Sequence, residues 1–224
     1  MIDKTLPHKA NTKNEKSFIA IEGPIGIGKT TLAEKLANSF HAELLLEGAS
    51  ENPFLEKFYQ DPKSGALPVQ LYFLFQRSRQ LQELRQSDMF APKHISDFLM
   101  DKDRLFARVT LDADELNLYE QVYENLTINA PVPDLVIYLQ APVETLLKRI
   151  RKRGRMMENR IDEEYLTKLA AAYTDFFHYY NDSPLLIVNA SAIDLINNEA
   201  DYQQLLERIE TTTSGRHYFN PKVL

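Results

Sequence analysis

FIAIEGPIGIGKTTLAEKL, residues 18–36, is the stretch that decides how this chain folds. Its first four residues form a short apolar run, which predicts a buried strand. From Leu32 onward, apolar residues recur at helical spacing, which predicts a helix. Between the two, residues 23–30 fit the pattern G-x-x-x-x-G-K-S/T. The order of strand, glycine-rich loop and helix favours a phosphate-binding loop over an ordinary glycine turn before a helix.

The residue types of this loop suit the binding of phosphate groups. Glycines let the backbone turn sharply and bring its N–H groups close to an anion, and the following helix adds the positive end of its dipole. Lys29 can reach the β- and γ-phosphates of a nucleotide, and the Thr30 hydroxyl can bind Mg²⁺. The expected phosphate-binding residues are Gly23, Gly26, Ile27, Gly28, Lys29, Thr30 and Thr31.

The composition narrows the class of protein. The 224 residues suffice for one α/β domain, and 44% hydrophobic with 26% charged residues is typical of a soluble globular protein. A formal net charge of −6 disfavours binding to a nucleic-acid polymer but allows a small phosphorylated ligand. The sequence has no cysteine, which excludes disulfides and thiolate metal sites and suits a reducing cytoplasm. No apolar run approaches membrane-spanning length, so no membrane association is expected.

The order of the predicted elements indicates a single domain. Residues 1–16 are polar and lack the apolar segment of a secretory signal, so we expect a mobile leader there. We expect one domain at 17–212 and a polar, weakly structured tail at 213–224. Strands are predicted at 18–21, 42–46, 94–100, 134–139 and 185–188, with helices between them. Strands that alternate with helices predict a parallel sheet covered on both faces.

Two acidic residues lie where predicted strands end. Glu47 follows the second strand, and Asp97 lies in the third strand segment, directly after His94-Ile95-Ser96. The carboxyl ends of parallel strands form the edge at which open α/β sheets bind ligands. Both carboxylates are therefore candidates for chemistry beside the phosphate-binding loop.

A glutamine and an arginine share one face of the long helix predicted at 66–86. Their face is set by spacings of four, three and four residues along Gln70, Leu74, Arg77 and Leu81. On periodicity alone, two interpretations remain open. The polar side chains either border the apolar stripe and reach solvent, as exposed arginines commonly do, or they face a ligand.

The basic segment KRIRKRGR, residues 148–155, is unusual in an acidic protein. A run of like charges is often a solvated face. Here the run follows a predicted strand and helix and contains a glycine, so it could instead close over phosphate groups as a lid with arginines as forked donors. The residues alone leave both interpretations open.

Taken together, these segments resemble the deoxynucleoside kinase family, especially the bacterial deoxyadenosine, deoxyguanosine and deoxycytidine kinases. The resemblance runs from about residue 18 to residue 209. It depends on IEGPIGIGKTTL at 21–32, on Glu47 followed by NPFLEKFY at 52–59, and on Gln70 with Arg77 on one helix. PDLVIYL at 133–139 and the arginines of the basic segment continue the pattern.

The resemblance implies an α/β fold of the P-loop NTPase type: a three-layer sandwich with a five-stranded parallel sheet, helices on both faces and an arginine-rich lid. It implies transfer of the γ-phosphate of ATP, with Mg²⁺, to the 5′-hydroxyl of a small-molecule deoxynucleoside, in a cytoplasmic homodimer of nucleotide salvage. The implied catalytic residues are Glu47, Lys29, Arg149, Arg153 and Arg155. The implied substrate-binding residues are Tyr59, Gln70, Arg77, Asp97 and Glu158, and the implied metal ligands are Thr30 and Asp97.

One position departs clearly from the family pattern. After the third strand the family carries Asp-Arg-Ser or Glu-Arg-Ser, whereas this chain continues from Asp97 with Phe98 and Leu99. Phe98 can neither stabilise phosphate charge nor hydrogen-bond a carboxylate. Lys102, or an arginine of the basic segment, could supply the missing charge. Gly48 also stands where many relatives carry proline.

Two other functions fit parts of the sequence. A kinase of the same fold could act on a nucleoside monophosphate or another small hydroxyl metabolite, although a monophosphate acceptor would need cations beyond the lid, where Arg77 and Arg79 are the obvious ones. A non-catalytic nucleotide-binding accessory protein would explain the missing arginine. The presence together of Lys29, Glu47 and Asp97 argues against that second alternative.

Overall fold

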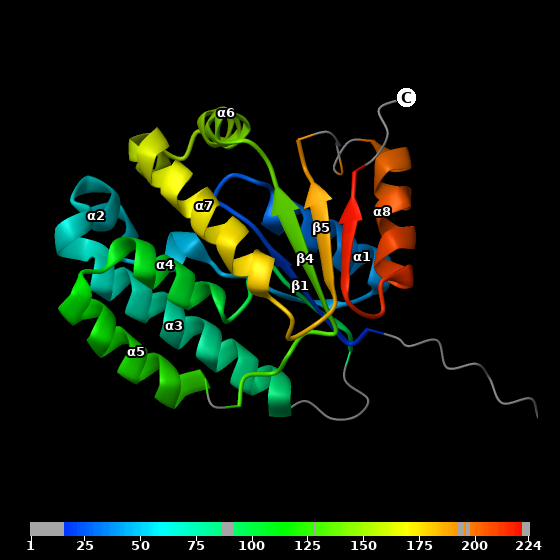
Figure 1. Cartoon of the computed structure of the whole chain (residues 1–224), viewed down its shortest axis with the longest axis horizontal. Coiled ribbons are helices and arrows are strands. Elements are labelled where there is room, and N and C mark those ends of the chain that lie inside the picture. Colours follow the sequence, from blue (N-terminus) through cyan, green and yellow to red (C-terminus); the bar gives the residue numbers. More distant parts are fainter. Residues whose placement is uncertain (1–15, 87–91, 128, 192–194, 196–197, 221–224) are drawn as a thin grey trace, which may run out of the picture.

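The structure is a computed structural model that describes residues 16–86, 92–127, 129–191, 195 and 198–220. Within these ranges a six-stranded sheet has the order β2-β3-β1-β4-β5-β6, and every neighbouring pair of strands is parallel. In Figure 1 the arrows of β4, β5 and the red strand β6 accordingly point the same way. The strands are β1 (Phe18–Glu22), β2 (Glu43–Leu45), β3 (His94–Ser96), β4 (Leu135–Gln140), β5 (Leu185–Asn189) and β6 (Arg216–Phe219).

Helices cover both faces of the sheet, which confirms the predicted α/β class. α1 (Lys29–Phe40) and α8 (Glu199–Thr211) pack on one face, and α4 (Lys102–Thr110) and α7 (Glu163–Tyr179) pack on the other. α3 (Pro62–Gln86) and α5 (Ala113–Thr127) lie beside α4 (Figure 1). None of the helices in the described ranges has the length and apolar character needed to cross a membrane. The remaining helices are α2 (Leu55–Gln60), α6 (Val143–Arg153) and the 3-10 helices η1 (Ala49–Glu51) and η2 (Met156–Arg160).

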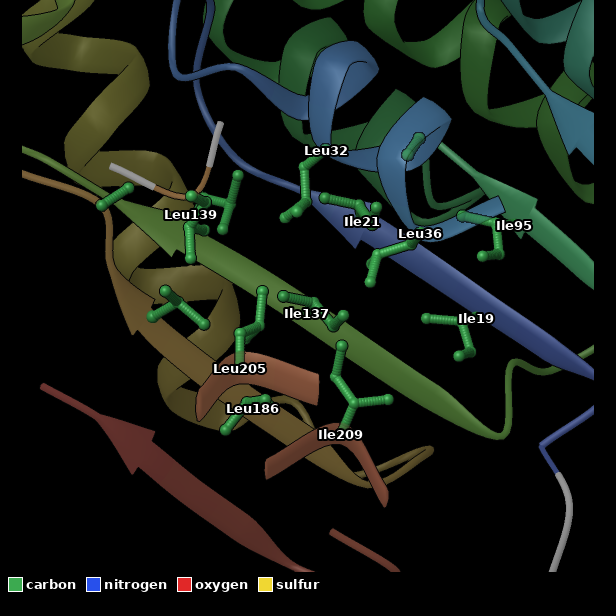
Figure 2. Close-up of a cluster of buried hydrophobic side chains, with 14 of the residues drawn as sticks. Ile19, Ile21, Leu32, Leu36, Ile95, Ile137, Leu139, Leu186, Leu205 and Ile209 are labelled. Atoms are coloured by element: carbon green, nitrogen blue, oxygen red, sulfur yellow. The ribbon is translucent and has the colours of Figure 1, made fainter. Parts of the chain in front are cut away.

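The strand β1 is buried on both faces, which explains why its sequence is continuously apolar up to Glu22. Ile19 and Ile21 point toward α1 and α8, where they pack with Leu32 and Leu36 (Figure 2). Ala20 points to the opposite face and belongs to the cluster under α7. This burial fixes β1 in the middle of the sheet and so fixes the start of the glycine-rich loop.

The predicted number of five strands is wrong, because β6 forms from residues that the sequence assigned to a polar tail. β6 is an edge strand that pairs only with β5, placing Arg216 opposite Leu185. Of its four residues only Phe219 is buried. A short strand that exposes most of its side chains shows little of the apolar alternation by which strands are predicted.

The proline and glycine of DPKSG at 61–65 predict a loop, and this prediction is also wrong, since α3 begins at Pro62. Proline is tolerated in the first turn of a helix, where its missing N–H has no partner to lose. Gly65 allows close packing rather than a turn: a Cβ atom there would lie 2.9 Å from the backbone nitrogen and Cα of Phe58. The glycine thus brings α2 directly against α3.

Candidate functional site

A pocket of about 310 Å³ lies at the carboxyl ends of β1, β2 and β3. These three strands are neighbours in the sheet, so the loops that follow them converge there. The basic end of α6 and the 3-10 helix η2 close another side. The sequence-predicted residues in its lining are Gly26, Gly28, Lys29, Thr30, Thr31, Glu47, Tyr59, Gln70, Asp97, Arg153, Arg155 and Glu158. Of the described site residues, Gly23, Ile27, Arg77 and Arg149 lie outside that lining.

The glycine-rich loop passes so close to β4 and α6 that two of its positions admit only glycine. A Cβ atom on Gly23, whose φ is 149°, would lie 2.6 Å from the carbonyl oxygen of Leu139. One on Gly26, whose φ is 82°, would lie 2.6 Å from the Ile150 side chain. The loop therefore passes close to both elements before α1 begins at Lys29.

The Lys29 ammonium lies over the loop that precedes it. Its Nζ donates hydrogen bonds to the carbonyl oxygens of Gly23 at 2.7 Å and Pro24 at 3.4 Å. Burial lowers the pKa of Lys29, and the charge of Lys102 lowers it further, while nearby carboxylates oppose both effects. The site thus holds a partly desolvated cation next to the loop amides.

Asp97 ties the glycine-rich loop to the segment after β2. Thr30 Oγ1 donates to Asp97 Oδ2 at 2.5 Å, and the backbone N–H of Glu47 donates to Asp97 Oδ1 at 2.7 Å. Across the described ranges, no group of three or more His, Cys, Asp or Glu side chains could hold a metal alone. A hydroxyl beside one carboxylate nevertheless fits Mg²⁺, which prefers oxygen ligands and commonly binds through one or two protein groups plus phosphates.

Glu47 lies between two cations at the end of β2. Its carboxylate forms an ion pair with Arg77, and Lys102 Nζ lies 2.9 Å from Oε2 and 3.1 Å from Oε1. Burial would raise the pKa of Glu47, but the charges of Arg77, Lys102 and Lys29 outweigh it and hold that pKa well below the usual glutamate range. Since a carboxylate can accept about four hydrogen bonds, Oε2 keeps room for one more donor.

Gln70 and Arg77 are both buried, with 3% and 1% of their surfaces exposed, so the solvent-facing interpretation is wrong. Gln70 lines the pocket, and its Nε2 donates to Thr110 Oγ1 at 3.3 Å. Arg77 lies behind the lining and pairs with Asp103 as well as with Glu47. Asp103 is fully buried. The helix face predicted from spacing therefore borders the site. Gln70 lines the pocket, and Arg77 contacts Glu47 from behind the lining.

The basic segment lies partly at the pocket and partly outside it. Arg153 and Arg155 line the pocket and pair with Glu158 at 2.5 and 3.5 Å. Gly154 lies between them and ends α6 in a left-handed conformation. Arg149 donates to the carbonyl oxygens of Ile27 at 3.0 Å and of Ala190 at 2.7 Å, which holds α6 on the glycine-rich loop. Lys148, Arg151 and Lys152 are exposed and lie outside the pocket lining.

Sequence reasoning missed Glu22, the last residue of β1. Its carboxylate is fully buried and accepts hydrogen bonds from the backbone N–H groups of Gly23 and Leu99, both at 2.9 Å, and from the Tyr173 hydroxyl at 2.8 Å. The strand-end argument that selected Glu47 would also have selected Glu22. No pattern in the sequence indicated the aromatic lining residues Phe58, Phe73, Phe106 and Tyr165.

Phe98 lies away from the pocket although it directly follows Asp97. Its side chain is 1% exposed and packs in an apolar cluster with Leu74 and Tyr119. The guanidinium carbon of Arg77 lies 5.7 Å from the centroid of its ring. The position after Asp97 is thus part of the core beneath the site.

Residues 19–214 match the family model for deoxynucleoside kinases. A deoxyguanosine kinase from Bacillus subtilis (strain 168) is 35% identical over 204 residues, which cover 88% of this chain and 98% of that protein. A deoxyadenosine kinase from Lactobacillus acidophilus is 30% identical over 206 residues, 86% of this chain and 94% of the relative.

A solved structure shows the same likeness in three dimensions. The deoxyadenosine kinase from M. mycoides with bound dATP superposes with a TM-score of 0.76 at 30% sequence identity. The match covers 87% of this chain and all of that chain.

Proposed function

The chain belongs to the deoxynucleoside kinase family, and from this premise we propose that it transfers the γ-phosphate of ATP to the 5′-hydroxyl of a deoxynucleoside. The observation that carries the proposal is the position of Glu47, which shares one pocket with Lys29 and Thr30 of the phosphate-binding loop. A carboxylate there can meet an acceptor hydroxyl next to the phosphate that is transferred.

The donor side of the proposal uses the loop and the first turn of α1. The loop N–H groups and the helix dipole bind phosphate oxygens, and Lys29 neutralises charge on the group in transfer. Thr30 and Asp97 are the residues that would hold Mg²⁺, which would offset the charge of the donor phosphates.

On the acceptor side, Glu47 receives the proton of the 5′-hydroxyl. Its depressed pKa keeps the carboxylate ionised at neutral pH, so it is always ready to accept a hydrogen bond. Phosphoryl transfer has a loose transition state in which the attacking oxygen needs little prior deprotonation. A weak but well-oriented base is therefore sufficient here.

The remaining lining residues define the substrate's position in this proposal. Tyr59 and Glu158 bind the sugar 3′-hydroxyl, and Gln70 makes a two-point contact with the base, because an amide offers both a donor and an acceptor. Arg153 and Arg155 turn from Glu158 toward the phosphates as the lid closes, which excludes water that would hydrolyse ATP. Arg149 supports this movement from the loop side of α6.

A panel of acceptors tests the proposal against its alternatives. ADP release from ATP and Mg²⁺ is measured with deoxynucleosides, nucleoside monophosphates and unrelated hydroxyl metabolites. We expect the highest kcat/KM with a deoxynucleoside. Turnover of a monophosphate or another metabolite in its place would favour the alternative kinase, and nucleotide binding without turnover of any acceptor would favour an accessory protein.

Phe98→Arg, which restores the family residue, is expected to lower stability without increasing deoxynucleoside phosphorylation. The new guanidinium would be buried in the cluster of Leu74 and Tyr119, next to the existing charge of Arg77. An unpaired buried charge should cost more than about 2 kcal/mol of unfolding free energy. The measurements are Tm and kcat, with Phe98→Leu as the apolar control. An unchanged Tm with several-fold higher kcat would contradict this expectation.

We further propose that the enzyme is a homodimer that works in the cytoplasm, where ATP is available. Support for the dimer comes from the adjoining helices α3 and α5, which expose the apolar side chains of Phe75 and Leu118 at 53% and 49%. Light scattering coupled to gel filtration should report twice the mass of one chain. A monomer at all concentrations would contradict the dimer.

A further inference from the structure

Lys102 lies beside Glu47, the candidate base. It approaches Glu47 from the segment that follows β3, where the sequence departs from the family pattern. It begins α4, and only 3% of its surface is exposed although it lines the pocket. Phe98, one turn earlier, points into the core instead. The cation that faces Glu47 beyond β3 is thus supplied by position 102, not by position 98.

The contacts of Lys102 place it between two carboxylates. Its Nζ lies 2.9 and 3.1 Å from the two oxygens of Glu47, and 3.9 Å from Glu22 Oε1. Glu22 is itself fixed by Gly23 at the start of the phosphate-binding loop. Lys102 therefore connects Glu47 to the same loop that would hold the donor phosphates.

The wider arrangement is a chain of alternating charges. Glu22 contacts Lys102, which contacts Glu47, which contacts Arg77, and Arg77 in turn contacts Asp103. Glu47 is the middle member, and it has one cation on each side. A buried charge is held firmly only when it is paired on the sides that solvent cannot reach. Removal of either cation should therefore free Glu47 to move.

We propose that Lys102 is the positioning residue for Glu47. Its ammonium fixes both oxygens of Glu47, so that the free acceptor site on Oε2 faces the substrate hydroxyl. The inference rests on the proposed function, in which Glu47 accepts that proton. Lys102 acts through Glu47, not on the reacting atoms.

Lys102→Met tests the inference, because methionine keeps most of the length and loses the charge. We expect kcat for the best deoxynucleoside to fall roughly 10²-fold, as for a misplaced catalytic group, with little change in KM for ATP. Lys102→Arg, which keeps the charge, should retain most of the activity.

Three controls separate positioning from structure. Lys168→Met removes an exposed lysine of α7 that pairs with Glu164 and should not change kcat. Lys102→Gln serves the same comparison where the methionine variant does not fold. In a Glu47→Gln background, Lys102→Met should cost little further activity, since its partner is already lost.

An active, folded Lys102→Met enzyme with unchanged kcat would overturn the inference, as would a loss that is fully additive with Glu47→Gln. Those results leave the proposed function intact, since the wild type would still phosphorylate a deoxynucleoside. A wild type that turns over none of the deoxynucleosides contradicts the proposed function itself.

Discussion

Lys29→Ala is expected to abolish phosphoryl transfer while the domain stays folded. Lys29 begins α1 beside the glycine-rich loop and lines the pocket with Glu47 and Thr30. A cation aimed at the transferred phosphoryl group stabilises charge that develops in the transition state. Its removal should cost several kcal/mol of barrier, roughly 10³-fold or more in kcat.

The fold should tolerate this change because the buried surroundings of Lys29 disfavour its positive charge. Burial lowers the pKa of Lys29, so at neutral pH the folded state disfavours the charged form relative to the unfolded chain. Tm should therefore be unchanged or higher in the alanine variant. Lys35→Ala is the matched control, since Lys35 lies on the same helix and pairs with Glu199 of α8. Normal turnover with unchanged ATP affinity in Lys29→Ala would contradict the assignment of the loop.

Glu47→Gln is expected to lower kcat by roughly 10²-fold or more, as for the loss of a general base. ATP binding should change far less, because in the proposed function Glu47 contacts the acceptor and the loop with Lys29 and Thr30 binds ATP. Glutamine keeps the shape of the side chain but cannot take the hydroxyl proton. Calorimetric titration of ATP and steady-state kinetics on the same sample separate the two effects.

The substitution should also lower Tm, since Arg77 and Lys102 both lose their ion pair with the Glu47 carboxylate in a buried site. Kinetics are therefore measured well below the melting transition. Glu51→Gln, at an exposed position of η1, is the control for the chemical change alone. If kcat falls by less than about tenfold, short of the general-base range, the base lies elsewhere and Asp97 is the next candidate.

The central part of the fold could be predicted because local sequence alone determines it. The buried strand β1 and the glycine loop need residue types that few other structures require, so their pattern is specific. The strand-end rule then placed Glu47 and Asp97 at the pocket without any knowledge of packing. By the same rule Glu22 was available and was overlooked.

What sequence could not supply depends on contacts between distant elements. β6 is held by backbone pairing with β5 and shows only one buried side chain, so no periodicity marks it. The sequence suggested a turn at Gly65, because the close packing of Gly65 against Phe58 depends on tertiary structure and is not visible in the sequence. The pairing of Arg77 with Asp103 links α3 to α4 and likewise leaves no trace in spacing.

The central claim is that the phosphate goes to the 5′-hydroxyl of a deoxynucleoside, and ³¹P NMR of the product tests it most directly. The enzyme is incubated with ATP, Mg²⁺ and the best deoxynucleoside of the panel, and the new monoester signal is recorded with proton coupling. The account predicts a phosphorus signal coupled to the two 5′ protons of the sugar, absent with Glu47→Gln over the same time. Coupling to the 3′ proton, or formation of ADP and inorganic phosphate without a new monoester, would contradict it.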